Sequence, residues 1–256
     1  NNFPVRPDPA GVFRPHGVEA YYLGLAGQGH FGRLNVSNAA YWAWGRDTLN
    51  PIAGQSQDIQ AQMAAVELSY DRDWVRFRTS FFWASGDPDP NDRNAEGFDA
   101  IFDNPNFAGG EFSYWQRQGI RLFGVGLVQR QSLLPNLRSS KLQGQTNFVN
   151  PGLTLVNGGI DMDLTPKLKL IGNVNFLWFD TTRSLEVFTF QDRIANEIGT
   201  DMSLGIEYRP YLNDNVMIIS GLSTFLPEDG FKDLYNTLGG TANSMYGHFF
   251  EVILTY

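Results

Sequence analysis

The chain has 256 residues, of which 42% are apolar, 14% aromatic and 18% charged, and its formal net charge is −8. This apolar content excludes a disordered chain, the lack of cysteine excludes disulfides and thiolate metal sites, and the acidic balance argues against nucleic-acid binding. No window supplies the roughly 20 consecutive apolar residues that a membrane-spanning helix needs. A membrane β-barrel is not excluded, because each of its strands needs only about 9–11 residues.

Apolar and polar residues alternate along most of the sequence. Between residues 73 and 84, for example, Val75 and Phe77 alternate with Arg76 and Arg78. This period of two places apolar residues on one face of a strand and polar residues on the other. In chain order the pattern predicts about nine strands, near residues 18–30, 33–45, 58–71, 73–85, 147–164, 167–180, 199–211, 215–226 and 245–256.

Two kinds of connection join the predicted strands, and they alternate. Short polar turns lie near residues 29–32, 70–73, 164–167 and 212–215. Long irregular connections span residues 46–57, 86–146, 181–198 and 227–244. All long connections therefore leave one end of the strands, which is typical of outer-membrane β-barrels with short periplasmic turns and long extracellular loops. Because lipid cannot satisfy unpaired backbone groups, these connections must lie on one aqueous side.

The last predicted strand, MYGHFFEVILTY, ends with an aromatic residue. It resembles the terminal strand of bacterial outer-membrane β-barrels, which is bound by the barrel assembly machinery. The assembly signal that this resemblance implies consists of Phe250, Val252, Leu254 and Tyr256.

Aromatic residues lie where a barrel would present girdles at the two membrane interfaces. Those beside the long connections, at the predicted outer interface, are Trp42, Trp44, Trp83, Trp178 and Phe179. Those beside the short turns or the terminus, at the predicted inner interface, are Tyr70, Trp74, Tyr208, Tyr211 and Tyr256. The alternative is aromatic packing in a soluble β-sandwich, which two bands at opposite strand ends fit poorly.

The sequence thus predicts an all-β fold, a transmembrane antiparallel up-and-down β-barrel in the bacterial outer membrane. Its C-terminus would be periplasmic and its long loops extracellular. If the last strand ends at the periplasm, counting back through about nine strands places the start of the first strand outside the cell. Bacterial single-chain barrels instead have an even number of strands and begin at the periplasm. We therefore expect residues 1–256 to be a single β-barrel domain, the C-terminal portion of a larger barrel of roughly 16–18 strands. Residues 86–146 would be a long extracellular loop, with an apolar stretch at 120–129 that suits a further hairpin.

The long loop begins with a distinctive acidic sequence. Trp83 is followed by ASGDPDPNDRN, and EGFD occupies residues 96–99. With VNPGLTL, YRPYLNDN and the final aromatic strand, this segment resembles the alginate-export family of outer-membrane proteins, over roughly the C-terminal half of such a barrel. The resemblance implies a wide monomeric barrel that conducts an anionic polysaccharide and has basic residues along its lumen.

The polar faces of the predicted strands supply the residues that would line the lumen. The cations are Arg33, Arg76, Arg78, Lys169 and Arg209. The anions are Glu67, Asp161, Asp163, Asp201, Glu207 and Glu251. Such a mixed wall does not strongly attract anions, so the resemblance predicts an outer-membrane channel without fixing alginate as its solute. Arg76 and Arg78 are the best candidates to steer an anion, and pairing with carboxylates such as Glu67 is the alternative.

Four residues of the acidic sequence, Asp87, Asp89, Asn91 and Asp92, offer closely spaced hard oxygens, as a calcium-binding loop does. They lack the glycine and the bidentate glutamate of an EF-hand, so a solvated acidic turn is the alternative. No cofactor other than this Ca²⁺ is predicted.

Motifs of familiar enzymes, such as GxSxG and HExxH, are absent, and we expect no enzymatic activity. The histidines His16, His30 and His248 lie in a predicted loop, a turn and a lipid-side strand position. A Ser-His-Asn hydrolase on the barrel wall would have His248 as its only strand-borne histidine.

The leading interpretation is an outer-membrane channel or porin that passes a polar or anionic solute or a polysaccharide. The alternative is a structural or binding barrel without open-pore transport, either a sleeve for an electron-transfer or other partner protein or a surface receptor. A soluble β protein is the third interpretation. Expected partners are membrane lipid, lipopolysaccharide and, during biogenesis, the barrel assembly machinery; nucleic acid is not expected.

Overall fold

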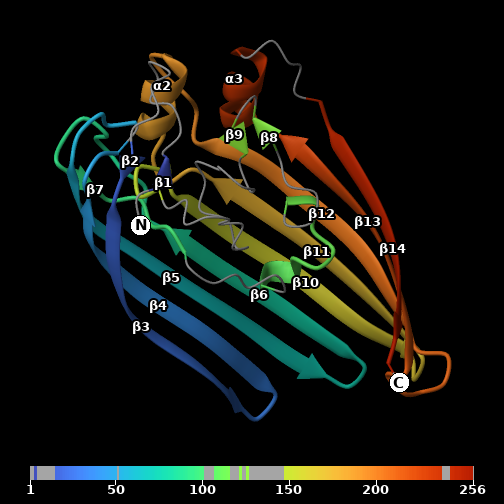
Figure 1. The fold of residues 1–256 in the computed structure, drawn as a ribbon. Coiled ribbons are helices and arrows are strands. Elements are labelled where there is room, and N and C mark those ends of the chain that lie inside the picture. Colours follow the sequence, from blue (N-terminus) through green and yellow to red (C-terminus); the bar gives the residue numbers. More distant parts are fainter. Residues whose placement is uncertain are drawn as a thin grey trace.

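The computed structural model describes residues 3–4, 15–50, 52–100, 107–115, 121–122, 125–126, 147–237 and 243–255. Most of these residues belong to one large sheet that curves into a trough (Figure 1). Its nine long strands are β3 (Val18–Phe31), β4 (Leu34–Asp47), β5 (Gln57–Arg72), β6 (Val75–Ala84), β10 (Leu153–Thr165), β11 (Leu168–Trp178), β12 (Glu197–Tyr208), β13 (Val216–Pro227) and β14 (Met245–Leu254).

Each long strand pairs antiparallel with the next long strand along the chain, which confirms the predicted all-β, up-and-down architecture. Within the described residues the sheet is not closed, and β3 and β14 form its two edges. Three minor pairings complete the strand list. β7 (Asn94–Ala95) pairs in parallel with β5, whereas β1 (Phe3–Pro4) pairs antiparallel with β2 (Pro15–His16), and β8 (Arg121–Leu122) pairs antiparallel with β9 (Val125–Gly126). The hairpin expected within residues 120–129 is this last pair, which lies outside the large sheet.

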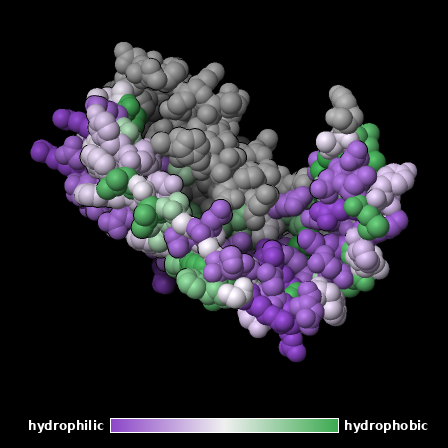
Figure 2. All heavy atoms as spheres, turned by 90° about the horizontal axis from the view of Figure 1, so that it is seen from below, coloured by the Kyte–Doolittle hydropathy of each residue, from purple (hydrophilic) through white to green (hydrophobic). Residues whose placement is uncertain are grey.

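Polarity across the sheet is the reverse of that in a soluble β-sandwich. On the convex face, Leu23, Leu25 and Leu222 are 64%, 76% and 59% exposed. On the concave face, Ser80 and Asn157 are only 2% and 1% exposed. A view from the short-turn end shows the curvature of the trough and hydrophobic side chains along its outer side (Figure 2). The alternation in the sequence thus becomes an apolar outer face and a polar inner face.

Short turns join the strands at one end of the sheet, as predicted. Two residues, Gly32 and Arg33, join β3 to β4. Gly32 has a φ of 62°, in the left-handed region that glycine occupies without steric cost. Asp73 and Leu212 adopt the same region, with φ of 54° and 59°, in the β5–β6 and β12–β13 turns.

The long connections lie together at the opposite end, and two of them contain helices that the sequence did not predict (Figure 1). These are α2 (Arg183–Thr189) and α3 (Asp229–Thr237). Phe231 of α3 packs edge-on against Phe225 of β13, with ring centroids 5.4 Å apart, and both side chains are fully buried. Such short helices are held by tertiary packing rather than by propensity, so a sequence pattern gives little sign of them. In the part of the chain that the structure describes, no helix is long and apolar enough to cross a membrane.

Asparagine side chains form hydrogen bonds between two long connections and within one of them. Asn50 Nδ2 donates a hydrogen bond to Asn147 Oδ1 (3.3 Å), and Asn150 Nδ2 donates to the Phe98 carbonyl (3.2 Å). The side chains of Asn147 and Asn150 also accept bonds from the backbone two residues later, at 2.9 Å and 2.8 Å. These local turns explain why β10 begins at Leu153 rather than at residue 147, since they bend the chain where the sequence predicted a strand.

The predicted aromatic girdles are reproduced in part. Trp42 and Trp44, beside a long connection, and Tyr70 and Trp74, beside a short turn, are all exposed. Phe179 is a correction, because it is 2% exposed and belongs to the apolar core beneath the loops. Tyr256 lies outside the described residues.

Candidate functional site: the concave face of the sheet

Two rows of polar side chains cross the concave face from strand to strand. We call the row nearer the long loops the upper polar row; in register it contains Ser37, Glu67, Ser80, Asn157, Asn175 and Asp201. We call its neighbour the lower polar row; it contains Asn35, Ser69, Arg78, Asn173, Ser203 and Ser223. Cross-strand partners share one face of a sheet, so adjacent members come from adjacent strands, except that Gly159 of β10 lies between Arg78 and Asn173 in the lower polar row.

Hydrogen bonds connect neighbours within the upper polar row. Ser80 Oγ donates to Glu67 Oε2 (2.7 Å), and Asn157 Nδ2 donates to Asn175 Oδ1 (2.7 Å). The side chains of Ser80, Asn157, Asn175 and Asp201 are all buried. The row is therefore an ordered polar network across five strands.

Residues 107–115 of the long loop lie against this network, and we call them the inner segment. The backbone N–H of Ala108 donates to Glu67 Oε2 (3.2 Å), and the Ala108 carbonyl accepts from Asn157 Nδ2 (3.3 Å). At the other end, Ser113 Oγ and the Trp115 N–H both donate to Asp201 Oδ2, at 2.9 Å and 2.5 Å. Two carboxylates of the upper polar row thus hold the inner segment inside the trough.

A slot for Phe112 fixes the inner segment laterally. A Cβ added to Gly205 would stand 2.1 Å from the Phe112 ring, and one added to Gly221 would stand 2.8 Å from it. The ring also packs against Phe249 of β14, with centroids 5.5 Å apart. Glycine within a strand marks a close approach of another group, and Gly205 and Gly221 are the only sequence sign of this contact.

Charged side chains gather on the concave face towards the short turns. Arg76 Nε lies 2.5 Å from Asp71 Oδ1, and Arg78 binds Asp161 at 2.7 Å and Asn173 Oδ1 at 2.9 Å. Arg78 and Asp161 are largely shielded from solvent, which strengthens their interaction. Glu67, the partner suggested by the sequence, instead binds Ser80 and the inner segment.

The remaining residues predicted to line a lumen also lie along this face or at its end. Lys169 lies 4.0 Å from Asp163, and Arg209 lies 3.5 Å from Glu207 and 3.1 Å from Asp214. In register, Glu251 of β14 follows Glu207 and Ile219 on the concave face. Arg33 is in the β3–β4 turn, where its carbonyl accepts a hydrogen bond from Asp71 N (2.9 Å). Their role in steering a solute stays a prediction.

The acidic loop sequence that was predicted to bind calcium uses its carboxylates in local turns. Asp89 N donates to Asp87 Oδ1 (3.1 Å), Asn91 N to Asp89 Oδ1 (3.1 Å), and Asn94 N to Asp92 Oδ1 (2.7 Å). Each carboxylate therefore closes a local turn two residues ahead instead of converging on one point. Over the described residues, no group of three or more His, Asp or Glu side chains is placed to hold a metal ion.

Asp87 is the exception to the solvent exposure expected of an acidic turn. Its side chain is 1% exposed, and its backbone N–H donates to the Asn150 carbonyl (2.8 Å). The pKa of the Asp87 carboxyl is raised to about 7, chiefly by burial and also by the nearby charges of Asp92, Glu96 and Asp89, while the hydrogen bond from the Asp89 backbone lowers it. This carboxyl is consequently a titrating group inside the loop cluster.

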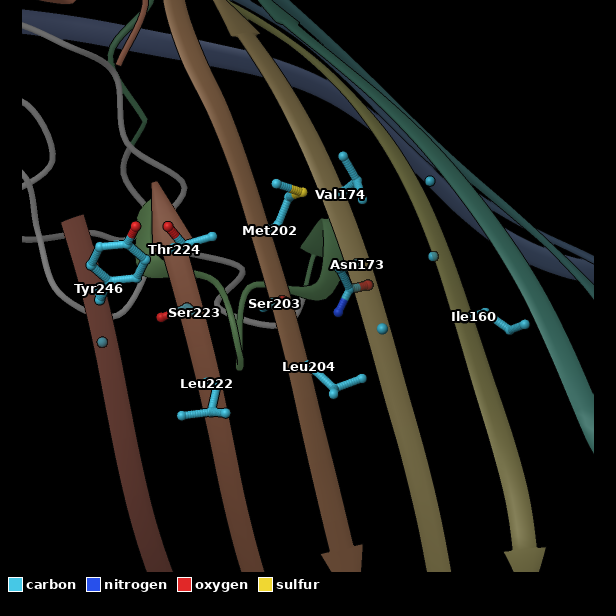
Figure 3. A pocket seen from close by; sticks show the side chains of 14 residues that line it. Ile160, Asn173, Val174, Met202, Ser203, Leu204, Leu222, Ser223, Thr224 and Tyr246 are labelled. Carbon is cyan, nitrogen blue, oxygen red and sulfur yellow. The ribbon is translucent and has the colours of Figure 1, made fainter. Parts of the chain in front are cut away.

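The convex face carries a shallow apolar groove (Figure 3). Met202, Leu204 and Leu222 project on the same side of β12 and β13, and Gly158 and Gly172 leave room beside them. His248 lies on this convex face, as predicted, and its Nε2 is 3.4 Å from Ser220 Oγ. His30 lies in β3 rather than in a turn, and His16 lies in β2, where its side chain is outside the described part of the structure.

No family model and no curated protein matches the sequence. Among solved structures, the chain is similar to outer-membrane expressed OmpT of Vibrio cholerae, with a TM-score of 0.40 and 12% identity over 90% of this chain and 52% of that chain. It is also similar to in-vitro folded OmpT of Vibrio cholerae, an outer membrane protein, with a TM-score of 0.32 and 13% identity over 98% of this chain and 56% of that chain.

The chain thus spans about half the length of the matched structures, and the alginate-export resemblance is not shown by these comparisons. The expectation that the chain is not an enzyme does not stand. It rested only on the absence of the motifs of familiar enzymes from the sequence, and such an absence does not exclude enzymatic activity.

Proposed function

We propose that the chain forms part of the wall of a bacterial outer-membrane channel that passes a polar solute. The main support for this proposal is that the outer, convex face of the sheet is apolar and the inner, concave face is polar. Leu25 and Leu222 on the convex face would expose apolar surface to water in a soluble protein, whereas lipid would bury it. The polar rows on the concave face would then border an aqueous interior.

The proposed orientation follows from the two kinds of connection. The short turns and the C-terminus would lie in the periplasm, and the loops that contain α2 and α3 would lie outside. Lipid and lipopolysaccharide would contact the convex face, on which Phe250, Val252 and Leu254 also lie for recognition by the barrel assembly machinery. Because open sheet edges are not tolerated in lipid, β3 and β14 would pair with further strands of a larger barrel.

The pairing of the basic residues bears on the kind of solute. Arg76 and Arg78 are each bound to an aspartate, so little of their charge remains to attract an anion. The proposal is therefore a channel for polar solutes with weak charge selectivity.

A second candidate function is a barrel that binds a partner and does not conduct. The inner segment favours it, because Phe112 and Trp115 fill part of the trough with buried side chains. Such a barrel would serve as a sleeve or as a receptor whose extracellular loops do the binding.

Single-channel recording distinguishes these functions. The native protein, purified in detergent and inserted into planar bilayers, should give discrete conductance steps with cation and anion permeabilities within a fewfold of each other. Insertion without conductance would refute the channel and favour the partner-binding barrel. Protein that stays in the aqueous phase without detergent would refute both.

A further inference from the structure

The polar rows offer hydrogen-bonding groups of a particular kind. Apart from Arg78, whose charge is matched by Asp161, the lower polar row contains only amides and hydroxyls. The upper polar row adds two carboxylates, Glu67 and Asp201, and both accept hydrogen bonds from neutral donors of the inner segment. The surface is therefore built to bind neutral groups that donate and accept hydrogen bonds.

The inner segment leaves part of this capacity unused. Asn173 and Ser203, cross-strand neighbours in the lower polar row, are 4% and 8% exposed. Asn173 Nδ2, Ser203 Oγ and Asp201 Oδ1 are all buried and have no hydrogen-bond partner among the described residues. Buried polar atoms without partners are costly, and native proteins contain few of them. Three such atoms lie on the concave face beside the inner segment. The surface can therefore form more hydrogen bonds with a ligand than it forms with the inner segment.

We infer that the polar rows bind a neutral polyhydroxylated solute, a saccharide chain, in the place that the inner segment occupies. A hydroxyl group suits this surface because it donates to a carboxylate and accepts from an amide. Hydroxyls of the solute would replace the donors of Ala108, Ser113 and Trp115 on Glu67 and Asp201, and would also reach the unpartnered groups of Asn173 and Ser203. This inference rests on the proposed function, in which solutes enter the trough.

The dimensions and the aromatic residues agree with a chain of several sugar units. From Glu67 to Asp201 the upper polar row crosses five adjacent strands. At about 4.8 Å per strand the row is roughly 19 Å long, which a single sugar ring does not cover. Phe249 of β14, against which Phe112 of the inner segment packs, would offer an aromatic face to the apolar side of a sugar ring. An anionic polysaccharide is disfavoured, because its carboxylates would meet Glu67 and Asp201.

Equilibrium binding to the native protein in detergent tests the inference without requiring conductance. Titration calorimetry would compare maltoheptaose with an oligogalacturonate of similar length, as the anionic saccharide, and with polyethylene glycol, which lacks repeated hydroxyl donors. Maltoheptaose should bind, and the other two should bind at least about tenfold more weakly. Equal or tighter binding of the anionic saccharide, or no binding of maltoheptaose, would overturn the inference.

A matched pair of variants locates the binding. Ser203→Ala removes a buried hydroxyl that has no partner, so the fold should be unaffected, while maltoheptaose affinity should fall about fivefold for the loss of one hydrogen bond. Thr224→Val is the control, because Thr224 Oγ1 is likewise buried and without a partner but lies on the convex face. Unchanged affinity in Ser203→Ala, or an equal loss in Thr224→Val, would contradict the assignment to the lower polar row.

Channel recordings separate the failure of this inference from the failure of the proposed function. Conductance that maltoheptaose does not interrupt, together with absent binding, would leave the channel in place and remove the saccharide. Binding with the predicted Ser203→Ala effect but without conductance would keep the saccharide site and remove transport.

Discussion

Replacing Asp87 by asparagine should make the stability of residues 85–100 nearly independent of pH between 5 and 8. The wild-type carboxyl lies within the loop cluster, where Oδ1 accepts from Asp89 N (3.1 Å) and Oδ2 is buried without a partner among the described residues. Asparagine keeps the acceptor at Oδ1 and has no charge to desolvate. The variant therefore copies the protonated form of the wild-type side chain.

The direction and size of the effect follow from the raised pKa. Burial raises the pKa of Asp87 to about 7, whereas an aspartate in an unfolded loop titrates near 3.9. The loop is therefore most stable below about pH 4, where both states are protonated, and loses stability as the pH rises towards 7. A shift of three pKa units corresponds to about 4 kcal/mol, and allowing for solvent screening leaves roughly 2 kcal/mol.

Hydrogen–deuterium exchange at pH 5 and pH 8, corrected for the intrinsic exchange rate, measures this stability. Amides of residues 85–100 that exchange by loop opening should open about tenfold more often at pH 8 than at pH 5 in the wild type, because about a third of the roughly 2 kcal/mol is already lost below pH 5. In Asp87→Asn the ratio should be close to one. Asp192→Asn, an exposed aspartate in another long connection, should behave like the wild type. Equal opening of the wild type at both pH values would refute the reasoning.

Three further predictions test the two faces of the sheet. Gly205→Val should displace Phe112 and the inner segment. In a Ser113→Cys background, the thiol at position 113 should then react at least tenfold faster with a thiol reagent. Gly158→Val is the control and should not change this rate, because no atom lies within 4 Å of the added Cβ. Arg78→Gln should leave the negative charge of Asp161 without its partner and raise the cation-to-anion permeability ratio a fewfold. Reversal potentials measure this ratio. An unchanged ratio would show that the Arg78–Asp161 pair does not border the solute path. Leu204→Arg should lower the free energy of unfolding in lipid vesicles by about 2–4 kcal/mol if the convex face contacts lipid, whereas Leu212→Arg, at an exposed short turn, should change it by less than about 0.5 kcal/mol.

The faces of the strands were predictable because they depend on local periodicity. Val75 and Phe77 alternate with Arg76 and Arg78 in the sequence, and a strand places alternate side chains on opposite faces whatever its neighbours are. The short turns were predictable for a similar reason, since residues such as Gly32 tolerate the backbone conformation that a tight turn needs. The pairing within each hairpin followed from its short turn, which leaves the two strands little choice of partner.

The partners of the charged and acidic residues were not predictable. Arg78 binds Asp161, which is 83 residues away in sequence, and not Glu67. The acidic loop could equally have gathered its oxygens around a cation or turned them to its own backbone; Asp89 and Asp92 do the latter. Such choices depend on where other strands and loops bring their polar groups.

The sequence by itself determined that the chain builds a sheet with one apolar and one polar face and places its long loops at one end, because periodicity and turn chemistry act within a few residues. Only the tertiary structure decided that residues 107–115 lie inside the trough. That placement depends on Ser113 meeting Asp201, 88 residues later, and on Phe112 entering the slot at Gly205 and Gly221. No local pattern in the long loop specifies these contacts, because they exist only after β12 and β13 have paired.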